Sequence, residues 1–285
     1  MIEPLIVSLG NRLYEVNRPW AADHIQTGRG HVSDVATDSR NRLYAFNRFD
    51  RYTDPAGSPA VAVYEPTNKL MRTLDLPKIS DGHGISIGPA DEIILVDRDR
   101  HVVYVLANDG SPKLTLGERN KPGSPFSHPT SAKVAPNGDI FVADGYGNSQ
   151  IHRFSADGRL IESWGSPGIG PGEFSTPHCI AFLKNGDIIV CDRENNRIQL
   201  FDEEGEFIRE IRDLFHPMAV AVDSEGMILV SDQIPRLSMF TSEGNLVGRC
   251  RPVLYGGHGM CIDNHGNIYL AELRVDRVTR LKLIK

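Results

Sequence analysis

The fold is decided by the stretch Ile180-Ala-Phe-Leu-Lys-Asn-Gly-Asp-Ile-Ile-Val-Cys-Asp192. Two apolar runs rich in β-branched residues flank an Asn-Gly pair, which is the chemistry of a tight β-hairpin. The second run ends on an acidic residue, and a third strand-length run, Arg197-Ile-Gln-Leu-Phe201, follows it closely. A turn containing Glu204-Gly then leads to another apolar run, so the region predicts four consecutive antiparallel strands.

This pattern occurs six times along the chain. The other copies are Val35–Asn47, Ile85–Asp97, Ser131–Asp144, Val220–Asp232 and Met260–Glu272. Their terminal acidic or amide residues, together with Asp192, are spaced by 50, 47, 48, 40 and 40 positions. Four strands in a repeat of this length are typical of a propeller blade. The sequence therefore predicts an all-β, six-bladed β-propeller in which residues 1–285 form one domain.

The last copy indicates how the ring closes. Only one further strand follows Glu272 before the chain stops at Lys285, so the sixth blade lacks a strand. We expect an early strand within residues 5–17 to supply it. The alternative architecture, an open β-solenoid, would leave both ends uncapped and would give no reason for six copies. The closed ring is therefore favoured.

Charge and composition exclude several classes of function. The net charge is −6 without a basic block, which argues against nucleic acid and anionic membrane surfaces as partners. No apolar run is long enough to span a membrane, and the N-terminus lacks the basic start and long apolar segment of a signal peptide. The four cysteines form no C-x-x-C pair. We expect a cytoplasmic protein with no obligate protein partner.

Three histidines share one position in the repeat. Fourteen residues before the terminal residue stand His83, His178 and His258 in the second, fourth and sixth copies. The same position in the other copies holds Ser33, Thr130 and Met218. Alternate blades of a six-bladed ring lie about 120° apart, so the imidazoles converge on the central channel. Three histidines with an open position suit zinc, although iron or another divalent metal would also fit. The other histidines are expected in loops, turns or at the surface.

The position after each terminal residue is expected to face the same channel mouth. It holds Arg48, Arg98, Gly145, Arg193, Gln233 and Leu273. An arginine there can bind a substrate carboxylate in bidentate fashion. The alternative is that each arginine pairs with a neighbouring acid such as Asp50, Asp97 or Glu194. Tyr146, flanked by two glycines, is expected to be exposed and able to act as a general base, unless it only packs between blades.

These residues carry a family resemblance. The segments 144–151, 176–180 and 191–201, which read DGYGNSQI, TPHCI and CDRENNRIQLF, resemble NHL-repeat propellers. More narrowly, they resemble peptidyl-α-hydroxyglycine α-amidating lyases, and the similarity extends over nearly all six blades. The resemblance implies that His83, His178 and His258 hold a catalytic zinc. It also implies that Tyr146 accepts the carbinol proton, while Arg48 and Arg193 bind the carboxylate and stabilise charge during C–N cleavage.

The chain departs from the family at several positions. The acidic residue that helps to bind the family's structural calcium is replaced by Gly259, which makes that calcium doubtful. A methionine of the pocket wall is replaced by Gly256. The positions of disulfide cysteines hold Gly147, Ile189 and Leu200, in keeping with a reducing compartment.

Three functions remain open from the sequence. The first is a metal-dependent C–N lyase that cleaves an α-hydroxy-N-acyl carboxylate, of carbinolamide or ureido type, to an amide and glyoxylate or a related carbonyl compound. Its partner would be a small-molecule carboxylate. The second is a non-catalytic NHL-repeat module that binds protein or ligand. The third is a metal-dependent lactonase or other hydrolase on the same fold, although such propellers generally use carboxylate-rich calcium sites.

Overall fold

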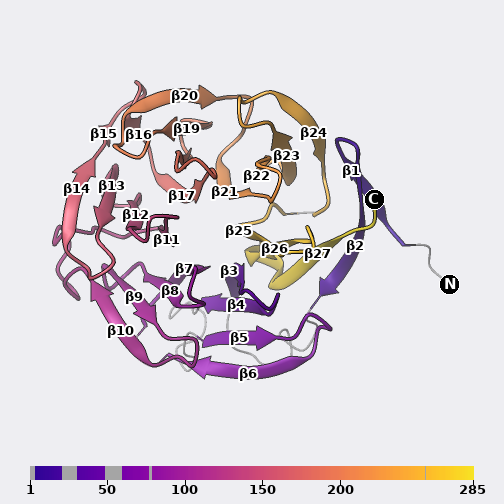
Figure 1. Cartoon of the computed structure of the whole chain (residues 1–285), viewed down its shortest axis with the longest axis horizontal. Helices are drawn as coiled ribbons and strands as arrows, with labels where there is room; N and C mark the ends of the chain where they lie inside the picture. The colour runs from indigo at the N-terminus through magenta and orange to yellow at the C-terminus, as the bar shows by residue number, and fades with distance from the viewer. Residues whose placement is uncertain (1–3, 21–30, 49–59, 77–78, 254) are drawn as a thin grey trace.

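Six blade-forming β-sheets, five with four strands and one with five, are arranged in a ring in the computed structural model (Figure 1). The structure describes residues 4–20, 31–48, 60–76, 79–253 and 255–285. The first blade consists of β3 (His31–Thr37), β4 (Leu43–Arg48), β5 (Ala60–Tyr64) and β6 (Leu70–Asp75). The second consists of β7 (Gly82–Ile87), β8 (Ile93–Asp97), β9 (Val102–Leu106) and β10 (Pro112–Leu116). The third consists of β11 (Ser131–Val134), β12 (Ile140–Asp144), β13 (Gln150–Phe154) and β14 (Leu160–Trp164).

The remaining blades repeat this order. The fourth contains β17 (Pro177–Phe182), β18 (Ile188–Asp192), β19 (Arg197–Phe201) and β20 (Phe207–Ile211). The fifth contains β21 (Pro217–Val222), β22 (Ile228–Asp232), β23 (Arg236–Phe240) and β24 (Leu246–Cys250). A short parallel pair, β15 (Ser166–Pro167) and β16 (Glu173–Phe174), lies between the third and fourth blades in the chain. The sixth contains β25 (Gly259–Ile262), β26 (Ile268–Glu272) and β27 (Arg277–Leu283).

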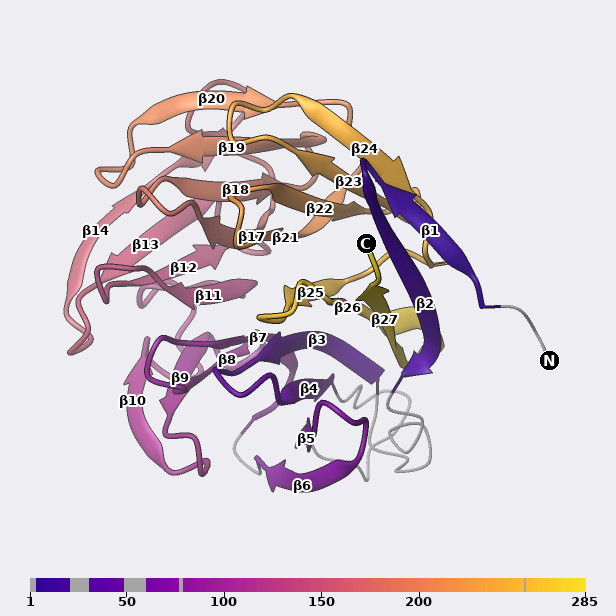
Figure 2. The same cartoon turned by 45° about the vertical axis from the view of Figure 1, so that its right-hand side comes forward.

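The N-terminus closes the ring in the sixth blade, as expected. Strand β2 (Arg12–Trp20) pairs antiparallel with β27, with Val16 opposite Leu281. The closing strand extends beyond the predicted 5–17 range. A further strand, β1 (Ile6–Leu9), pairs with β2 and gives this blade a fifth strand. Figure 2 shows β2 running beside β27, and β1 lying next to β24 of the fifth blade.

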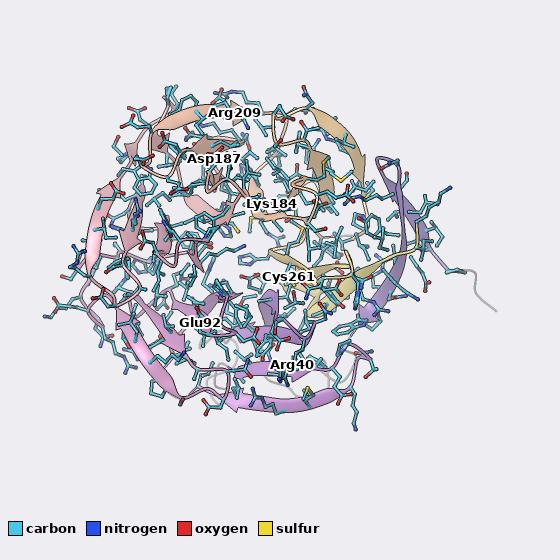
Figure 3. The ribbon with its side chains drawn as sticks, in the orientation of Figure 1. Arg40, Glu92, Lys184, Asp187, Arg209 and Cys261 are labelled. Atoms are coloured by element: carbon cyan, nitrogen blue, oxygen red, sulfur yellow. The ribbon has the colours of Figure 1, made fainter. Side chains whose placement is uncertain are left out.

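Burial explains why the strands read as continuous apolar runs. Every residue of the second strand in blades two to six is buried. These strands are covered on both faces because neighbouring blades stack on one another, and the apolar clusters lie between blades. The outer strands are partly exposed, and Arg209 lies on one of them, whereas Cys261 lies on an inner strand beside the channel (Figure 3).

In the second to fifth blades, the aspartate that ends the repeat is buried for a structural reason. Its carboxylate accepts the backbone N–H of the residue 17 positions earlier, in the segment that enters the inner strand. The pairs are Asp97 with Ser80, Asp144 with Ser127, Asp192 with Ser175 and Asp232 with Phe215, at 2.9, 2.8, 2.7 and 3.3 Å. These bonds fix the approach to the position that carries the histidine in alternate blades. Among the described residues, no helix is long and apolar enough to cross a membrane.

Candidate metal centre and active site

The three in-register histidines meet at the centre of the ring. His83 lies in β7, His178 lies in β17, and His258 directly precedes β25. Their ring centroids are 4.9 to 5.1 Å apart in all three pairs. One nitrogen from each ring lies within 4.8 Å of the other two. The sequence prediction that alternate blades bring these side chains together is therefore confirmed.

A repeated hydrogen bond orients each imidazole. The Nδ1 atom of each of these three histidines contacts a backbone carbonyl. A carbonyl can only accept a hydrogen bond, so Nδ1 carries the proton and Nε2 has the free lone pair. The acceptors occupy the same register position in the next blade: Thr130 for His83 at 2.6 Å, Met218 for His178 at 2.7 Å and Ser33 for His258 at 2.7 Å. The blades without histidine thus supply the second layer of the site.

The chemistry of this donor set fits a divalent metal. Burial, together with nearby positive charge, lowers the pKa of His83 and of His178 well below the ordinary value, and lowers the pKa of His258 to about 4. Neutral imidazoles with fixed lone pairs are the form that coordinates a metal. His83 and His178 are buried, and His258 is partly accessible from a pocket. Three histidines with a position left open match catalytic zinc sites.

Tyr146 lies directly over this centre. Its hydroxyl oxygen is 3.1 Å from Nε2 of His83 and 3.4 Å from Nε2 of His178. The flanking glycines are required by close packing: a Cβ at Gly145 would lie 2.1 Å from the carbonyl oxygen of Pro177, and one at Gly147 would lie 2.3 Å from the Ser127 hydroxyl. Tyr146 is 38% exposed, so it lies at the channel mouth and is not packed between blades.

The arginines around Tyr146 are each paired with an acid. Nη1 of Arg193 donates to the Tyr146 hydroxyl at 3.3 Å, and its Nε donates to Glu194 at 2.7 Å. Arg48 pairs with Asp81 at 2.6 Å, a partner that the sequence did not indicate. Asp97, one of the acids considered from the sequence, instead accepts backbone N–H groups. Asp50 lies outside the described residues.

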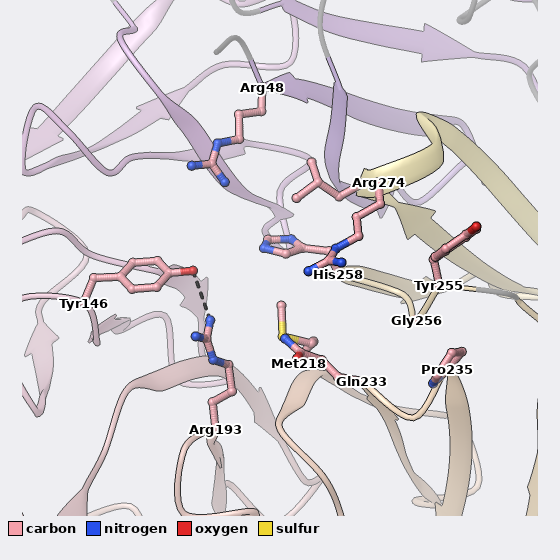
Figure 4. Close-up of a pocket in the computed structure, with 11 residues that line it drawn as sticks. Arg48, Tyr146, Arg193, Met218, Gln233, Pro235, Tyr255, Gly256, His258 and Arg274 are labelled. Atoms are coloured by element: carbon pink, nitrogen blue, oxygen red, sulfur yellow. Dashed lines mark hydrogen bonds between the residues drawn. The ribbon is translucent and has the colours of Figure 1, made fainter. Parts of the chain in front are cut away.

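A cavity of about 320 Å³ opens over His258 (Figure 4). Arg48, Tyr146 and Arg193 lie on one side of it. Met218, Pro235, Tyr255 and Leu273 contribute apolar surface elsewhere, and the other lining residues are Gln233, Gly256, His258 and Arg274. The cavity is large enough for a small organic ligand. Its charged lining side chains are all arginines, which favours an anionic ligand.

The surroundings of Gly259 do not fit a calcium ion. A Cβ at this position would lie 1.9 Å from Oδ1 of Asp34, so the Asp34 carboxylate fills that space. Its two oxygens accept the N–H groups of Val35, at 2.8 Å, and Ile85, at 3.0 Å. One carboxylate engaged in this way falls short of the oxygen-rich cage that calcium requires.

One other histidine differs from expectation: His152 lies in strand β13 and is buried. His101 lies in a turn, as expected, and is also buried. His152 lies between Ser163, at 2.7 Å from Nδ1, and Asp144, at 3.4 Å from Nε2. Sequence reasoning also missed Arg274, which lines the cavity, and the carbonyls that orient the metal-site histidines. The carbonyls had a signal, because their residues share the histidine register in the alternate blades.

Comparison with known proteins agrees with the fold. The NHL repeat model matches residues 126–154 and 174–201. The chain is 30% identical to peptidylglycine α-amidating monooxygenase of Rattus norvegicus over 89% of its own length, and 28% identical to peptidyl-α-hydroxyglycine α-amidating lyase 1 of Drosophila melanogaster over 94%. It spans 30% of the first protein and 59% of the second.

A solved structure shows the same fold at low identity. A gluconolactonase from Xanthomonas campestris superposes with a TM-score of 0.72 at 15% identity, covering 100% of this chain and 96% of the other. A sequence identity of this size, together with the superposition, shows a shared fold and nothing about function. The blades and the sequence comparison together show a six-bladed β-propeller that contains matches to the NHL repeat and is similar in sequence to the peptidyl-α-hydroxyglycine α-amidating lyases.

Proposed function

We propose that this protein is a metal-dependent carbon–nitrogen lyase acting on an α-hydroxy-N-acyl carboxylate, which it cleaves to an amide and glyoxylate or a related carbonyl compound. The observation that carries the proposal is the placement of the Tyr146 hydroxyl, 3.1 Å from Nε2 of His83, beside a cavity lined by Arg48 and Arg193. The relationship to amidating lyases supports the same reaction class.

The three histidines would hold the metal. Zinc is our first assignment, with iron or another divalent metal as alternatives. When bound, the ion would supply Lewis-acid polarisation of a substrate oxygen. The chain's part is to keep His83, His178 and His258 neutral and oriented through their Nδ1 bonds to backbone carbonyls.

Tyr146 is suited to move the proton. As the phenolate, its oxygen would take the proton of the carbinol hydroxyl, and the released O–H electron pair would form the new C=O bond. The C–N bond breaks at the same carbon, and its electron pair goes to the amide nitrogen, which takes the proton from the Tyr146 hydroxyl so formed. The reaction is redox-neutral and needs no co-reactant. Arg193, which donates to the Tyr146 hydroxyl at 3.3 Å, stabilises negative charge on that oxygen.

The arginines would bind the carboxylate of the substrate. Arg48 and Arg193 line the cavity from different blades, and each is held by a carboxylate, Asp81 or Glu194. An arginine that is already oriented loses little freedom when it binds a carboxylate. The acyl half of the substrate would then lie toward Met218 and Pro235, which contribute apolar surface to the cavity.

The test is direct. Metal-loaded and chelated protein are incubated with N-acyl-α-hydroxyglycines and with ureidoglycolate, and released glyoxylate is measured. We expect activity in the loaded protein, loss on chelation and recovery with one divalent metal. Tyr146→Phe should lower kcat by about 10² to 10⁴.

A matched pair of histidine variants separates the metal site from general effects. His178→Ala should lose both metal and activity, whereas His265→Ala, on an exposed turn, should keep both. Full metal content and full activity in His178→Ala would refute the proposal. Metal-free protein that is indifferent to Tyr146→Phe would favour the binding module. Turnover of lactones without release of glyoxylate would favour the hydrolase.

Location and partners are also proposals. All four cysteines are free thiols, which supports a reducing compartment such as the cytoplasm. The arginine-lined cavity supports a small carboxylate as the partner.

A further inference from the structure

A second arginine, Arg98, lies against the ring of Tyr146. Its guanidinium carbon is 5.5 Å from the ring centroid, the same distance as that of Arg193. Arg98 occupies the register position of Arg48 and Arg193 in the second blade, directly after the buried Asp97. Unlike those two, it does not line the cavity over His258. It therefore contacts the tyrosine without facing the space for the substrate.

One buried carboxylate connects this contact to the cavity. Asp81 is 4% exposed and pairs with both Arg48 and Arg98. Nε of Arg48 lies 2.6 Å from Oδ1 of Asp81, and its Nη2 donates to Oδ2 at 3.1 Å. Asp81 is itself fixed by the backbone, since its N–H donates to Asp97 and its carbonyl accepts the N–H of Arg98 at 3.0 Å.

We propose that Asp81 and Arg98 are positioning residues for the lyase reaction. Arg98 holds the Tyr146 ring over the histidines by a cation–π contact, and Asp81 holds Arg98 and Arg48 in one fixed arrangement. The inference rests on the proposed function. It adds that the positions of Tyr146 and Arg48 depend on each other through Asp81. The side chain that moves the proton and the side chain that binds the carboxylate share one anchor.

This arrangement predicts that substitutions of Arg98 and Asp81 change kcat and KM differently. Arg98→Met keeps the aliphatic stem but removes the cation, so kcat should fall about tenfold while KM changes less than about twofold. Arg98→Lys keeps a charge over the ring and should recover part of kcat. Asp81→Asn releases Arg48 as well, so kcat should fall and KM should rise together. Arg159→Met, at an exposed arginine of the third blade, is the control and should match wild type.

A ¹⁹F NMR measurement reports on the environment of Tyr146 and does not require enzyme turnover. Protein labelled with 3-fluorotyrosine gives one ¹⁹F resonance for each tyrosine, and Tyr146→Phe identifies the signal of Tyr146. Arg98→Met should shift or broaden that signal, and Arg159→Met should not. Wild-type protein that releases no glyoxylate would defeat the proposed function but leave this arm to decide the placement of Tyr146.

Two outcomes would overturn the inference. In the first, Arg98→Met leaves both kcat and the Tyr146 signal unchanged. In the second, it raises KM with kcat intact, which would make Arg98 a substrate-binding group. If Arg98→Met does not fold, Arg98→Gln carries the same two measurements, because it removes the cation but keeps a hydrogen-bond donor next to Asp81.

Discussion

Burial makes the ionisation of Asp34 unfavourable in the folded protein. This residue lies in β3 of the first blade, accepts an N–H from Ile85 in β7 of the second, and fills the space beside Gly259 of the sixth. Burial raises its pKa to about 7, even though two N–H bonds and the nearby Lys133 lower it. The carboxylate is therefore held closely by three blades in a place that favours its protonated form.

This shift predicts a pH-dependent stability. The folded pKa of Asp34, about 7, lies above the unfolded value of about 3.9, so the folded state binds more protons between these limits. The contribution is full below the unfolded pKa and is lost as pH rises through the folded one. The contribution of Asp34 to the free energy of unfolding should fall with pH over this window, by at most about 1.4 kcal/mol per pH unit.

Urea titrations of metal-free wild type and Asp34→Asn, repeated from acid to neutral pH, measure this contribution. The difference between the two profiles should carry the slope, because all other titrating groups are common to both proteins. Parallel profiles would mean that Asp34 titrates as it does in the unfolded chain.

At the level of elements, the closing strand matters for the seam between the last and first blades. Trp20, at the end of β2, is buried and packs edge-on against Tyr64 of the first blade, at 6.0 Å, and Tyr269 of the sixth, at 5.1 Å. It belongs to an apolar cluster that includes Val32 and Val278 from these two blades. One side chain thus joins the N-terminal strand, the C-terminal blade and the first blade.

Trp20→Ala should therefore lower the free energy of unfolding by about 3 to 5 kcal/mol. Truncation removes a large apolar surface and leaves a cavity at the point where the ring closes. Trp164→Ala is the matched control: Trp164 ends the outer strand β14, is only partly buried, and should cost less. Urea unfolding measures both variants. An equal loss for the two would show that the closing seam has no special weight.

The strands that belong to the repeat could be predicted from the sequence, whereas the strands outside the repeat could not. Hairpin turns and β-branched runs predicted the blades because each strand is buried between two neighbours. The fifth strand, β1, was missed because four residues at the edge of a sheet carry almost no periodic signal. The pair β15 and β16 was missed because two-residue strands depend on tertiary contacts alone.

At the scale of the whole molecule, the rotational symmetry of the ring allowed the candidate metal centre to be predicted from the sequence. His83, His178 and His258 could be aligned because equal positions in alternate blades reach the same point. Asp81 could not be found in this way, since it precedes its inner strand and occupies no repeated acidic position. Its role depends on where two arginine side chains meet, which only the folded ring determines.

The same symmetry makes the centre a cross-link between blades. An ion held by the three histidines would connect the second, fourth and sixth blades, and each ligand is already bonded to the next blade through its Nδ1 atom. The unfolded chain has no such site, so metal binding adds to folding stability by mass action.

We expect a metal concentration about 100 times its Kd to add about 2.7 kcal/mol, which corresponds to a rise in Tm of about 4 to 5 °C. Thermal unfolding of wild type, with metal and with chelator, measures this rise. His178→Ala should show no difference between the two conditions, because two histidines from the second and sixth blades cannot complete the link. His265→Ala should behave as wild type. Equal metal-dependent shifts in wild type and His178→Ala would place the stabilising ion elsewhere in the protein.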